Sequence, residues 1–212
     1  MQIAITTFTE THTPVLPIAT VDNSDDIIPI VDALQRAEIN ALEITLRTPA
    51  GLDAIKKVRS NHPGLFICAG SVNTEEQLIQ SVDAGADLVI SPGISRRLIE
   101  TAQIEKASIL PGISTASDIL LGMEYGLRYF KFFPAAQLGG LPYLHAMSEP
   151  FSGIQFCVTG GINTNNIQHY LASQKVLCVG GSWITTTDYI AQKNWSAIEQ
   201  AAIDTVKIIE GK

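Results

Sequence analysis

The chain is poor in the residues that hold metal ions or form disulfide frameworks. It has three cysteines and four histidines among 212 residues, and none of them shows Cys-x-x-Cys or His-x-x-x-His spacing. Cys68, Cys157 and Cys178 each lie inside an apolar run, which is typical of a buried thiol that acts as a small hydrophobic side chain. We therefore expect no disulfide framework, no metal site and no other cofactor.

Positive charge and long apolar runs are also scarce. The chain has 14 Lys and Arg against 21 Asp and Glu, a formal net charge of -7, and no basic stripe interleaved with aromatic residues. It is therefore not expected to bind nucleic acid or an anionic membrane. No apolar run reaches the length that spans a bilayer, and the first ten residues resemble neither a signal peptide nor a transit peptide. We expect a cytoplasmic protein, which could still bind a phosphorylated substrate through local backbone N–H groups.

Short apolar runs rich in β-branched residues recur along the chain, and each is followed by a turn and a helical pattern. The eight expected strands are residues 15–20, 41–46, 65–69, 88–91, 108–111, 129–132, 155–159 and 176–179. Helices are expected to begin at Ser24, Thr48, Thr74, Ser95 and either Ser114 or Thr115.

Eight strand–helix units in a chain of this length most economically close into a parallel barrel. The expected fold is therefore α/β, a single (β/α)8 TIM barrel over residues 1–212 with a short N-terminal helical extension. An open doubly wound sheet is the alternative. No Gly-x-Gly-x-x-Gly loop follows the first expected strand, which argues against a nicotinamide enzyme.

Lys131 lies in a run of aromatic residues, Tyr-Phe-Lys-Phe-Phe-Pro. Burial disfavours the ammonium form of a lysine, so a buried amine can attack a carbonyl and form a Schiff base. Strand alternation places Lys131 on the face opposite Phe130 and Phe132, and it points into the barrel if those two rings pack under helices. The alternative is a lysine whose stem lies on the aromatic rings while its charge stays in water.

Glu43 lies in the expected strand 41–46, where apolar residues alternate with Glu43, Thr45 and Arg47. If the apolar face meets the helices, Glu43 points into the barrel interior, where a carboxylate needs a partner or a task. Glu43 and Lys131 could then meet as a proton carrier and an amine nucleophile. A structural ion pair and an exposed edge strand are the alternatives.

Pairs of glycines follow the seventh and eighth expected strands, at Gly160-Gly161 and Gly180-Gly181, and Ser182 follows the second pair. Phosphate sites in barrels of this kind often lie after strands 7 and 8, where glycines let backbone N–H groups approach an anion. One such pair would indicate only a turn, whereas two pairs at these positions favour a phosphate site.

Six motifs occur in order along the chain: EITLRT (43–48), AGSV (69–72), ISPG (90–93), PGIST (111–115), FKFFPA (130–135) and TGGI (159–162). Together they resemble the class I 2-keto-3-deoxy-6-phosphogluconate (KDPG) aldolase family, which includes 4-hydroxy-2-oxoglutarate (KHG) aldolases. The likeness runs from Pro14 to Trp183.

The resemblance implies that Lys131 forms the imine with the keto acid and that Glu43 moves protons. It implies that Arg47 binds the carboxylate and that Ser71, where the family more often has Thr, adds a hydroxyl. The other implied contacts are Pro92 and Phe133 at the imine, and Thr159, Gly160, Gly161 and Ser182 at the phosphate. Some relatives carry an arginine near the end of the first strand, where this chain has Ala19-Thr20.

The expected reaction is cleavage of 2-dehydro-3-deoxy-6-phospho-D-gluconate to pyruvate and D-glyceraldehyde 3-phosphate, a step of the Entner-Doudoroff pathway. 4-Hydroxy-2-oxoglutarate, which gives pyruvate and glyoxylate, is a second expected substrate. An imine accepts the electrons of the breaking C–C bond, so this chemistry requires no metal. The partners are then a keto acid, a phosphorylated aldehyde and, since relatives are commonly trimers, two further copies of the chain.

Three alternatives to this reaction stay open. The first is an aldolase for the galactonate epimer of the substrate. The second is a phosphate-binding barrel isomerase, epimerase or decarboxylase in which Lys131 acts only as a charge. The third is a barrel that binds a ligand without catalysis.

Overall fold

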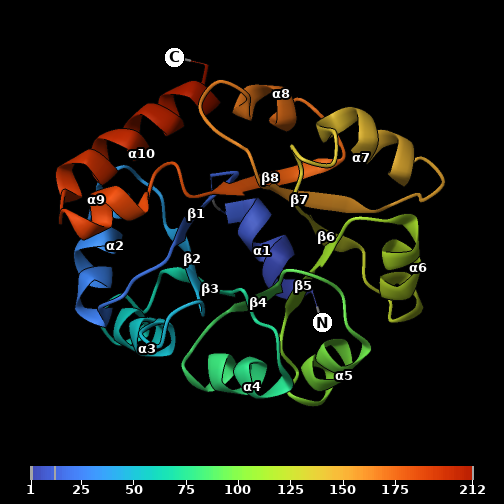
Figure 1. Cartoon of the computed structure of the whole chain (residues 1–212), viewed down its shortest axis with the longest axis horizontal. Coiled ribbons are helices and arrows are strands. Elements are labelled where there is room, and N and C mark those ends of the chain that lie inside the picture. Colours follow the sequence, from blue (N-terminus) through green and yellow to red (C-terminus); the bar gives the residue numbers. More distant parts are fainter. Residues whose placement is uncertain (1, 12, 212) are drawn as a thin grey trace.

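The computed structural model describes residues 2–11 and 13–211. Eight parallel strands form a closed barrel in chain order, and helices surround it (Figure 1). The strands are β1 (Val15–Ala19), β2 (Ala41–Thr45), β3 (Phe66–Gly70), β4 (Leu88–Ser91), β5 (Ile109–Ile113), β6 (Tyr129–Phe132), β7 (Gln155–Thr159) and β8 (Val176–Gly181). The expected (β/α)8 barrel is confirmed, and an open sheet is wrong.

The helices begin with α1 (Ile3–Thr11), which precedes the first strand as the expected N-terminal extension. The others are α2 (Ile27–Arg36), α3 (Gly51–Asn61), α4 (Glu75–Asp83), α5 (Arg96–Ile104), α6 (Ala116–Glu124), α7 (Gly140–Ser148), α8 (Ile167–Leu171), α9 (Thr187–Ala191) and α10 (Trp195–Ile209). A 3-10 turn, η1 (Ser24–Asp26), leads into α2. No helix of the described residues combines the length and apolar character needed to cross a membrane.

The helix starts follow the expected capping residues in part. Thr74 caps α4, and Thr115 caps α6 in a reciprocal arrangement with Asp118. The start expected at Thr48 is wrong, because α3 begins at Gly51 and the Thr48 hydroxyl donates instead to the carbonyl of Val21, 2.5 Å away. This bond joins the loop after β2 to the loop after β1.

Two strands are longer than the sequence predicted. β5 continues to Ile113 and β8 to Gly181, through glycines that normally end a strand. In the barrel, Gly112 pairs with Lys131 and Gly180 pairs with Thr159. The neighbouring strands therefore keep these glycines in the sheet.

The barrel has two layers of core. Aliphatic and aromatic side chains between strands and helices form the larger layer. The smaller layer fills the barrel and includes Cys68, Cys157 and Cys178, which are buried and free. Helix α1 adds Ile5 and Phe8 to this inner layer. The ring of Phe8 lies 5.3 Å from that of Phe66, the first residue of β3. Helix α1 thus fills the end of the barrel where the strands begin.

Candidate functional site

Lys131 and Glu43 meet inside the barrel. The amine of Lys131, on β6, donates to Oε1 of Glu43, on β2, over 3.3 Å, and the two residues are 7% and 1% exposed. Phe130 and Phe132 lie on the opposite face, fully buried in the outer core. A lysine with its charge in water is therefore wrong for Lys131, and an exposed edge strand is wrong for Glu43.

Two buried polar atoms, one of Glu43 itself and one of a residue that lines the same cavity as Lys131, have no hydrogen-bond partner within the described residues. They are Oε2 of Glu43 and the hydroxyl Oγ1 of Thr159. Buried polar atoms in folded proteins are nearly always paired, so each unpaired one requires an explanation. A bound substrate with its own polar groups would supply the missing partners.

Arg47 and Ser71, two of the expected substrate-binding residues, contact each other. Arg47 follows β2 and donates from Nε to the hydroxyl of Ser71, 3.0 Å away, which follows β3. Ser71 has a φ of +58°, an uncommon value for a residue with a side chain. The loop after β3 is therefore held in an uncommon backbone conformation next to Arg47.

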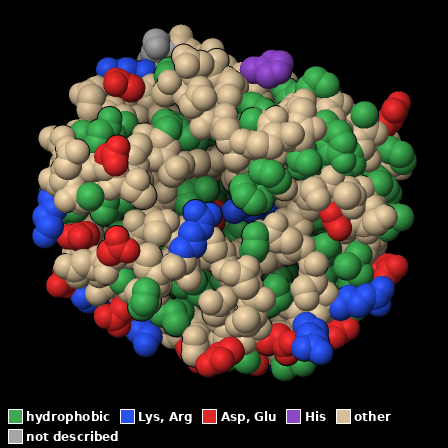
Figure 2. Space-filling view, viewed as in Figure 1, with side chains coloured by type: hydrophobic (Ala, Val, Ile, Leu, Met, Phe, Trp, Pro, Cys, Tyr) green, Lys and Arg blue, Asp and Glu red, His purple; other side chains and the backbone are tan. Residues whose placement is uncertain are grey.

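A cavity of about 220 Å³ opens at the ends of β1, β6, β7 and β8. Its lining includes seven of the expected site residues: Arg47, Lys131, Phe133, Thr159, Gly160, Gly161 and Ser182. Figure 2 shows Lys or Arg side chains at the centre of this face, over the ring of strands in Figure 1. The carboxyl ends of the strands are the usual place for the active site of such a barrel.

Three expected residues do not line this cavity. Glu43 lies beneath the cavity and accepts a hydrogen bond from Lys131, which lines it. Ser71 accepts a hydrogen bond from Arg47, which also lines it. Pro92 packs against β5, because a Cβ built on Gly112 would lie 2.1 Å from the carbonyl oxygen of Pro92.

Sequence reasoning missed three hydroxyl residues of the cavity: Thr20, Thr185 and Thr187. The hydroxyl of Thr20 lies 2.8 Å from that of Thr45, and Thr185 donates to the carbonyl of Ile18. Thr20 could have been found, since it ends the first expected strand. The other two follow the last strand in a Thr-Thr-Thr run that has no spacing signal.

The loop after β7 needs both of its glycines. Gly160 and Gly161 have φ values of +97° and +80°, the left-handed region that favours glycine. A Cβ on Gly161 would also lie 2.4 Å from Cβ of Ala136. The backbone of this loop therefore lines the cavity directly.

The Lys131 amine lies 5.6 Å from the centre of the Phe133 ring. This ring places an aromatic face beside the amine, as expected from the sequence. Together with Glu43 below, the ring shields Lys131 on two sides and leaves the cavity as the approach for a ligand.

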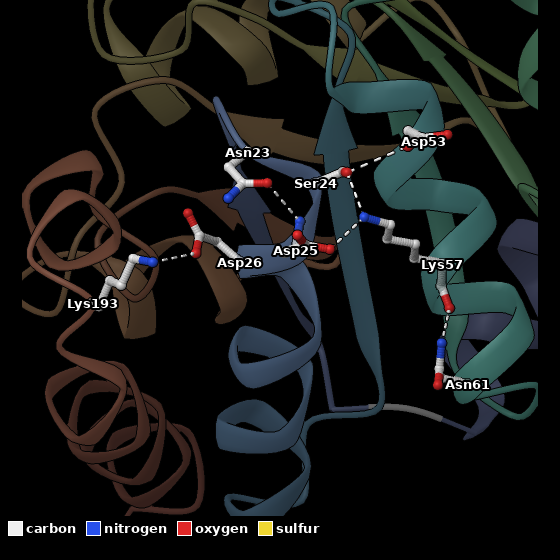
Figure 3. A network of polar contacts seen from close by, with 8 residues as sticks. All are labelled: Asn23, Ser24, Asp25, Asp26, Asp53, Lys57, Asn61 and Lys193. Carbon is white, nitrogen blue, oxygen red and sulfur yellow. Dashed lines mark hydrogen bonds and ion pairs between the residues drawn. The ribbon is translucent and has the colours of Figure 1, made fainter.

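The loop after β1, which carries Thr20, is tied down by charged residues (Figure 3). Lys57 of α3 donates to Asp25 over 2.5 Å and to the hydroxyl of Ser24 over 2.7 Å. Lys193, between α9 and α10, lies 3.5 Å from Asp26. These contacts hold the helix start after β1 against α3 on one side and against the segment before α10 on the other.

A larger hollow of about 930 Å³ lies away from these residues. Its lining comes from the end of α7, the start of β7 and the turn between α8 and β8, and includes His145, Glu149 and Lys175. It contains none of the expected site residues. The smaller cavity at the strand ends is therefore the candidate functional site.

The sequence of this chain is similar to those of known proteins. The family model described as KDPG and KHG aldolase matches residues 7–201. The KHG/KDPG aldolase of Escherichia coli is 40% identical over 194 residues, which cover 92% of this chain and 91% of that protein.

Two solved structures are similar in fold as well as in sequence. A KDPG aldolase from Legionella pneumophila, with pyruvate captured as a covalent carbinolamine intermediate, has a TM-score of 0.89 and 38% identity over 93% of this chain and 96% of that one. The 2-keto-3-deoxy-6-phosphogluconate aldolase of Zymomonas mobilis, with 3-phosphoglycerate, has a TM-score of 0.86 and 38% identity over 95% and 94% of the two chains.

Proposed function

Because this chain belongs to the KDPG and KHG aldolase family, we propose that it acts as a class I aldolase through an imine on Lys131. The reaction is cleavage of 2-dehydro-3-deoxy-6-phospho-D-gluconate to pyruvate and D-glyceraldehyde 3-phosphate, which makes the protein an aldehyde-lyase. The observation that carries the mechanism is the buried Lys131–Glu43 contact of 3.3 Å beneath an open cavity.

The first half of the reaction joins the substrate to Lys131. The amine gives up a proton and attacks the C2 carbonyl, and the resulting carbinolamine loses water to form the imine. Glu43 is the carboxylate that contacts the amine, and its Oε2 has no partner within the part of the chain that the structure describes, so it can accept and return these protons. The carbinolamine captured in the Legionella pneumophila protein supports this route.

The second half breaks the C3–C4 bond. The C4 hydroxyl loses its proton, the bond electrons move to the imine nitrogen, and the aldehyde leaves. The enamine then takes a proton at C3, and water releases pyruvate from Lys131. Glu43 is the proposed proton carrier for these steps.

The substrate's two ends have different binding groups. Arg47, held by Ser71, binds the carboxylate by its guanidinium fork, and the ring of Phe133 lies beside the imine. The phosphate end meets the backbone at Gly160-Gly161 and a set of hydroxyls: Thr159, Ser182 and the added Thr20, Thr185 and Thr187.

The phosphate is held here without an arginine on β1. Among the described residues that line the cavity, Arg47 and Lys131 are the only Lys or Arg. A substrate that ends in a carboxylate therefore loses few charged contacts relative to one that ends in a phosphate. This supports 4-hydroxy-2-oxoglutarate as a second substrate, in line with the name of the Escherichia coli relative.

Borohydride trapping tests the imine. Pyruvate and borohydride should add one reduced pyruvyl group per chain, and peptide mapping should place it on Lys131. Lys131→Met should remain unmodified under the same conditions, and Lys56→Met, which changes an exposed lysine of α3, should react like the natural chain. An unchanged mass, or an adduct on another lysine, would contradict the mechanism. Activity that survives in Lys131→Arg would favour the isomerase, epimerase or decarboxylase alternative.

Steady-state rates with three substrates test the specificity. The phosphogluconate-derived acid should be cleaved faster than its C4 epimer, the galactonate-type substrate, and 4-hydroxy-2-oxoglutarate should also yield pyruvate. Equal rates for the two epimers would contradict the proposed preference.

The proposed protein is a cytoplasmic, single-domain chain that assembles as a homotrimer, and the trimer is what the family resemblance implies. Light scattering coupled to size exclusion measures the mass in solution. A mass of one or two chains would contradict the trimer.

A further inference from the structure

Gly70, the last residue of β3, lies against the carboxylate of Glu43. A Cβ built on Gly70 would lie 2.2 Å from Oε1 of Glu43, 2.6 Å from its Cγ and 2.7 Å from its Cδ. Real Cβ atoms essentially never come within 3.0 Å of another heavy atom, so no other residue type fits here while Glu43 keeps its place.

The backbone does not explain this glycine. Gly70 is not among the glycines with a positive φ, and it pairs in register with Thr45 inside the sheet. A glycine within a strand weakens the strand unless something must approach the backbone closely. Here the three nearest atoms all belong to one side chain, that of Glu43.

Gly112, in β5, and Gly160, after β7, differ in this respect. A Cβ on Gly112 would meet the backbone of Pro92, and one on Gly160 would meet the backbone of Pro134. Substitution at those positions would move a loop. Substitution at Gly70 acts on one carboxylate.

The Glu43 carboxylate has few other restraints. Its Oε1 accepts from Lys131, and its Oε2 has no partner within the described residues. The lack of a side chain at Gly70 therefore decides whether Oε1 can lie 3.3 Å from the Lys131 amine.

We propose that Gly70 is a positioning residue that holds open the site of the Glu43 carboxylate, so that this carboxylate can exchange protons with Lys131. The inference rests on the proposed function. A methyl group at position 70 must push Oε1 away by about 1 Å to reach an ordinary contact distance, and a displacement of that size at a reacting group can slow a reaction about 100-fold.

Gly70→Ala tests the inference, with Gly64→Ala as the matched control. Gly64 is exposed, has no positive φ and would place its Cβ where nothing lies within 4 Å. Gly70→Ala should lower kcat about 100-fold and should slow the exchange of pyruvate methyl protons with deuterated solvent to a similar degree. Gly64→Ala should leave both rates unchanged.

A shorter carboxylate at position 43 distinguishes the proposed role of Gly70 from a purely structural one, because the two roles predict different catalytic rates in the double variant. Glu43→Asp withdraws the carboxylate by one methylene and should slow the natural chain. In the Gly70→Ala background it should slow the reaction much less, or restore part of it, because the added methyl then has room. If the losses of rate in the two single variants simply add in the double variant, the inference is wrong. It is also wrong if Gly70→Ala reacts at the rate of the natural chain.

Stability measurements decide the case if Gly70→Ala folds poorly. Combining it with Glu43→Ala removes the contacting side chain and should restore the unfolding midpoint. No restoration would overturn the inference. Borohydride trapping separates the two proposals: if the natural chain does not trap pyruvate on Lys131, the proposed function fails, and if the natural chain and Gly70→Ala trap it at equal rates, only the role of Gly70 fails.

Discussion

The amine of Lys131 lies 3.3 Å from Oε1 of Glu43, across the interior of the barrel and 88 positions apart in sequence. Burial removes both charges from water, and a single hydrogen bond offsets this desolvation only in part. The pair is therefore a weak source of stability. Its value to the protein lies in the chemistry that a buried amine and a neighbouring carboxylate perform together.

Glu43→Gln keeps the shape of the side chain but removes its ability to accept a proton. We expect kcat to fall about 10² to 10⁴-fold, the usual contribution of general acid–base catalysis, with a smaller change in KM. A coupled assay of pyruvate release measures both, and a thermal melt checks that the fold is intact. A kcat within a few-fold of the natural value would remove Glu43 from the mechanism.

Thr159→Val replaces a buried hydroxyl that has no partner in the described structure with a methyl group of the same shape. The unfolding free energy should stay equal or rise by about 1 kcal/mol, because an unpaired buried hydroxyl is costly. The kcat/KM should fall about tenfold, since the substrate loses one hydrogen bond.

Thr205→Val is the matched control for this prediction. Thr205 is also buried, but its hydroxyl accepts from Trp183 and donates to the carbonyl of Ala201. This change should destabilise the protein by about 1 to 3 kcal/mol and leave kcat/KM unchanged. If Thr159→Val destabilises the chain as Thr205→Val does, the Thr159 hydroxyl is structural.

The strands and the reacting pair could be predicted because their signals are local. Alternation within five residues shows that Glu43 and Lys131 lie opposite to apolar faces, and a closed barrel has only one interior to receive them. The bounds of β6 and β7 follow from their apolar runs alone.

Features that depend on how distant segments meet could not be predicted. The contact between Gly70 and Glu43 requires the register of β2 against β3. Thr48 looks like a helix cap in sequence, but its hydroxyl bonds to Val21, 27 residues away. Thr185, after β8, lines the cavity because its hydroxyl bonds to the carbonyl of Ile18 on β1, the strand that pairs with β8 to close the barrel.

The contact between Lys57 and Asp25 predicts a pH-dependent stability. Hydrogen bonding and charge attraction from Lys57 lower the pKa of Asp25 below its ordinary value of 3.8. A lowered folded-state pKa adds stability that is present above the ordinary pKa and lost as pH falls through the folded one. Asp25→Asn should therefore destabilise the chain slightly near neutral pH, and the difference should vanish in strong acid.

Urea unfolding of the two chains at several pH values measures this difference. Asp25 is exposed, so the effect should also shrink in high salt. Asp22→Asn, on the same loop and without a described ion pair, is the control and should show no such trend. A stability difference between the two chains that persists below the pKa of Asp25 would mean that the effect comes from the packing of the loop and not from the charge of Asp25.

The three cysteines should resist alkylation in the folded protein. Burial, and then the charge of Glu43, raise the pKa of the Cys68 thiol well above 9.0. A hydrogen bond with Cys157, and then burial, raise that of Cys178 in the same direction. The thiolate is the reactive form, so mildly alkaline iodoacetamide should label neither thiol while the barrel is closed.

Mass spectrometry measures the number of labels per chain over time. It should find three labels in denaturant, and in native buffer the labels should appear at the rate of global unfolding. Fast labelling of Cys68 in the folded protein would mean that the barrel interior opens locally beside Glu43, and the buried pair would then be accessible to water without substrate.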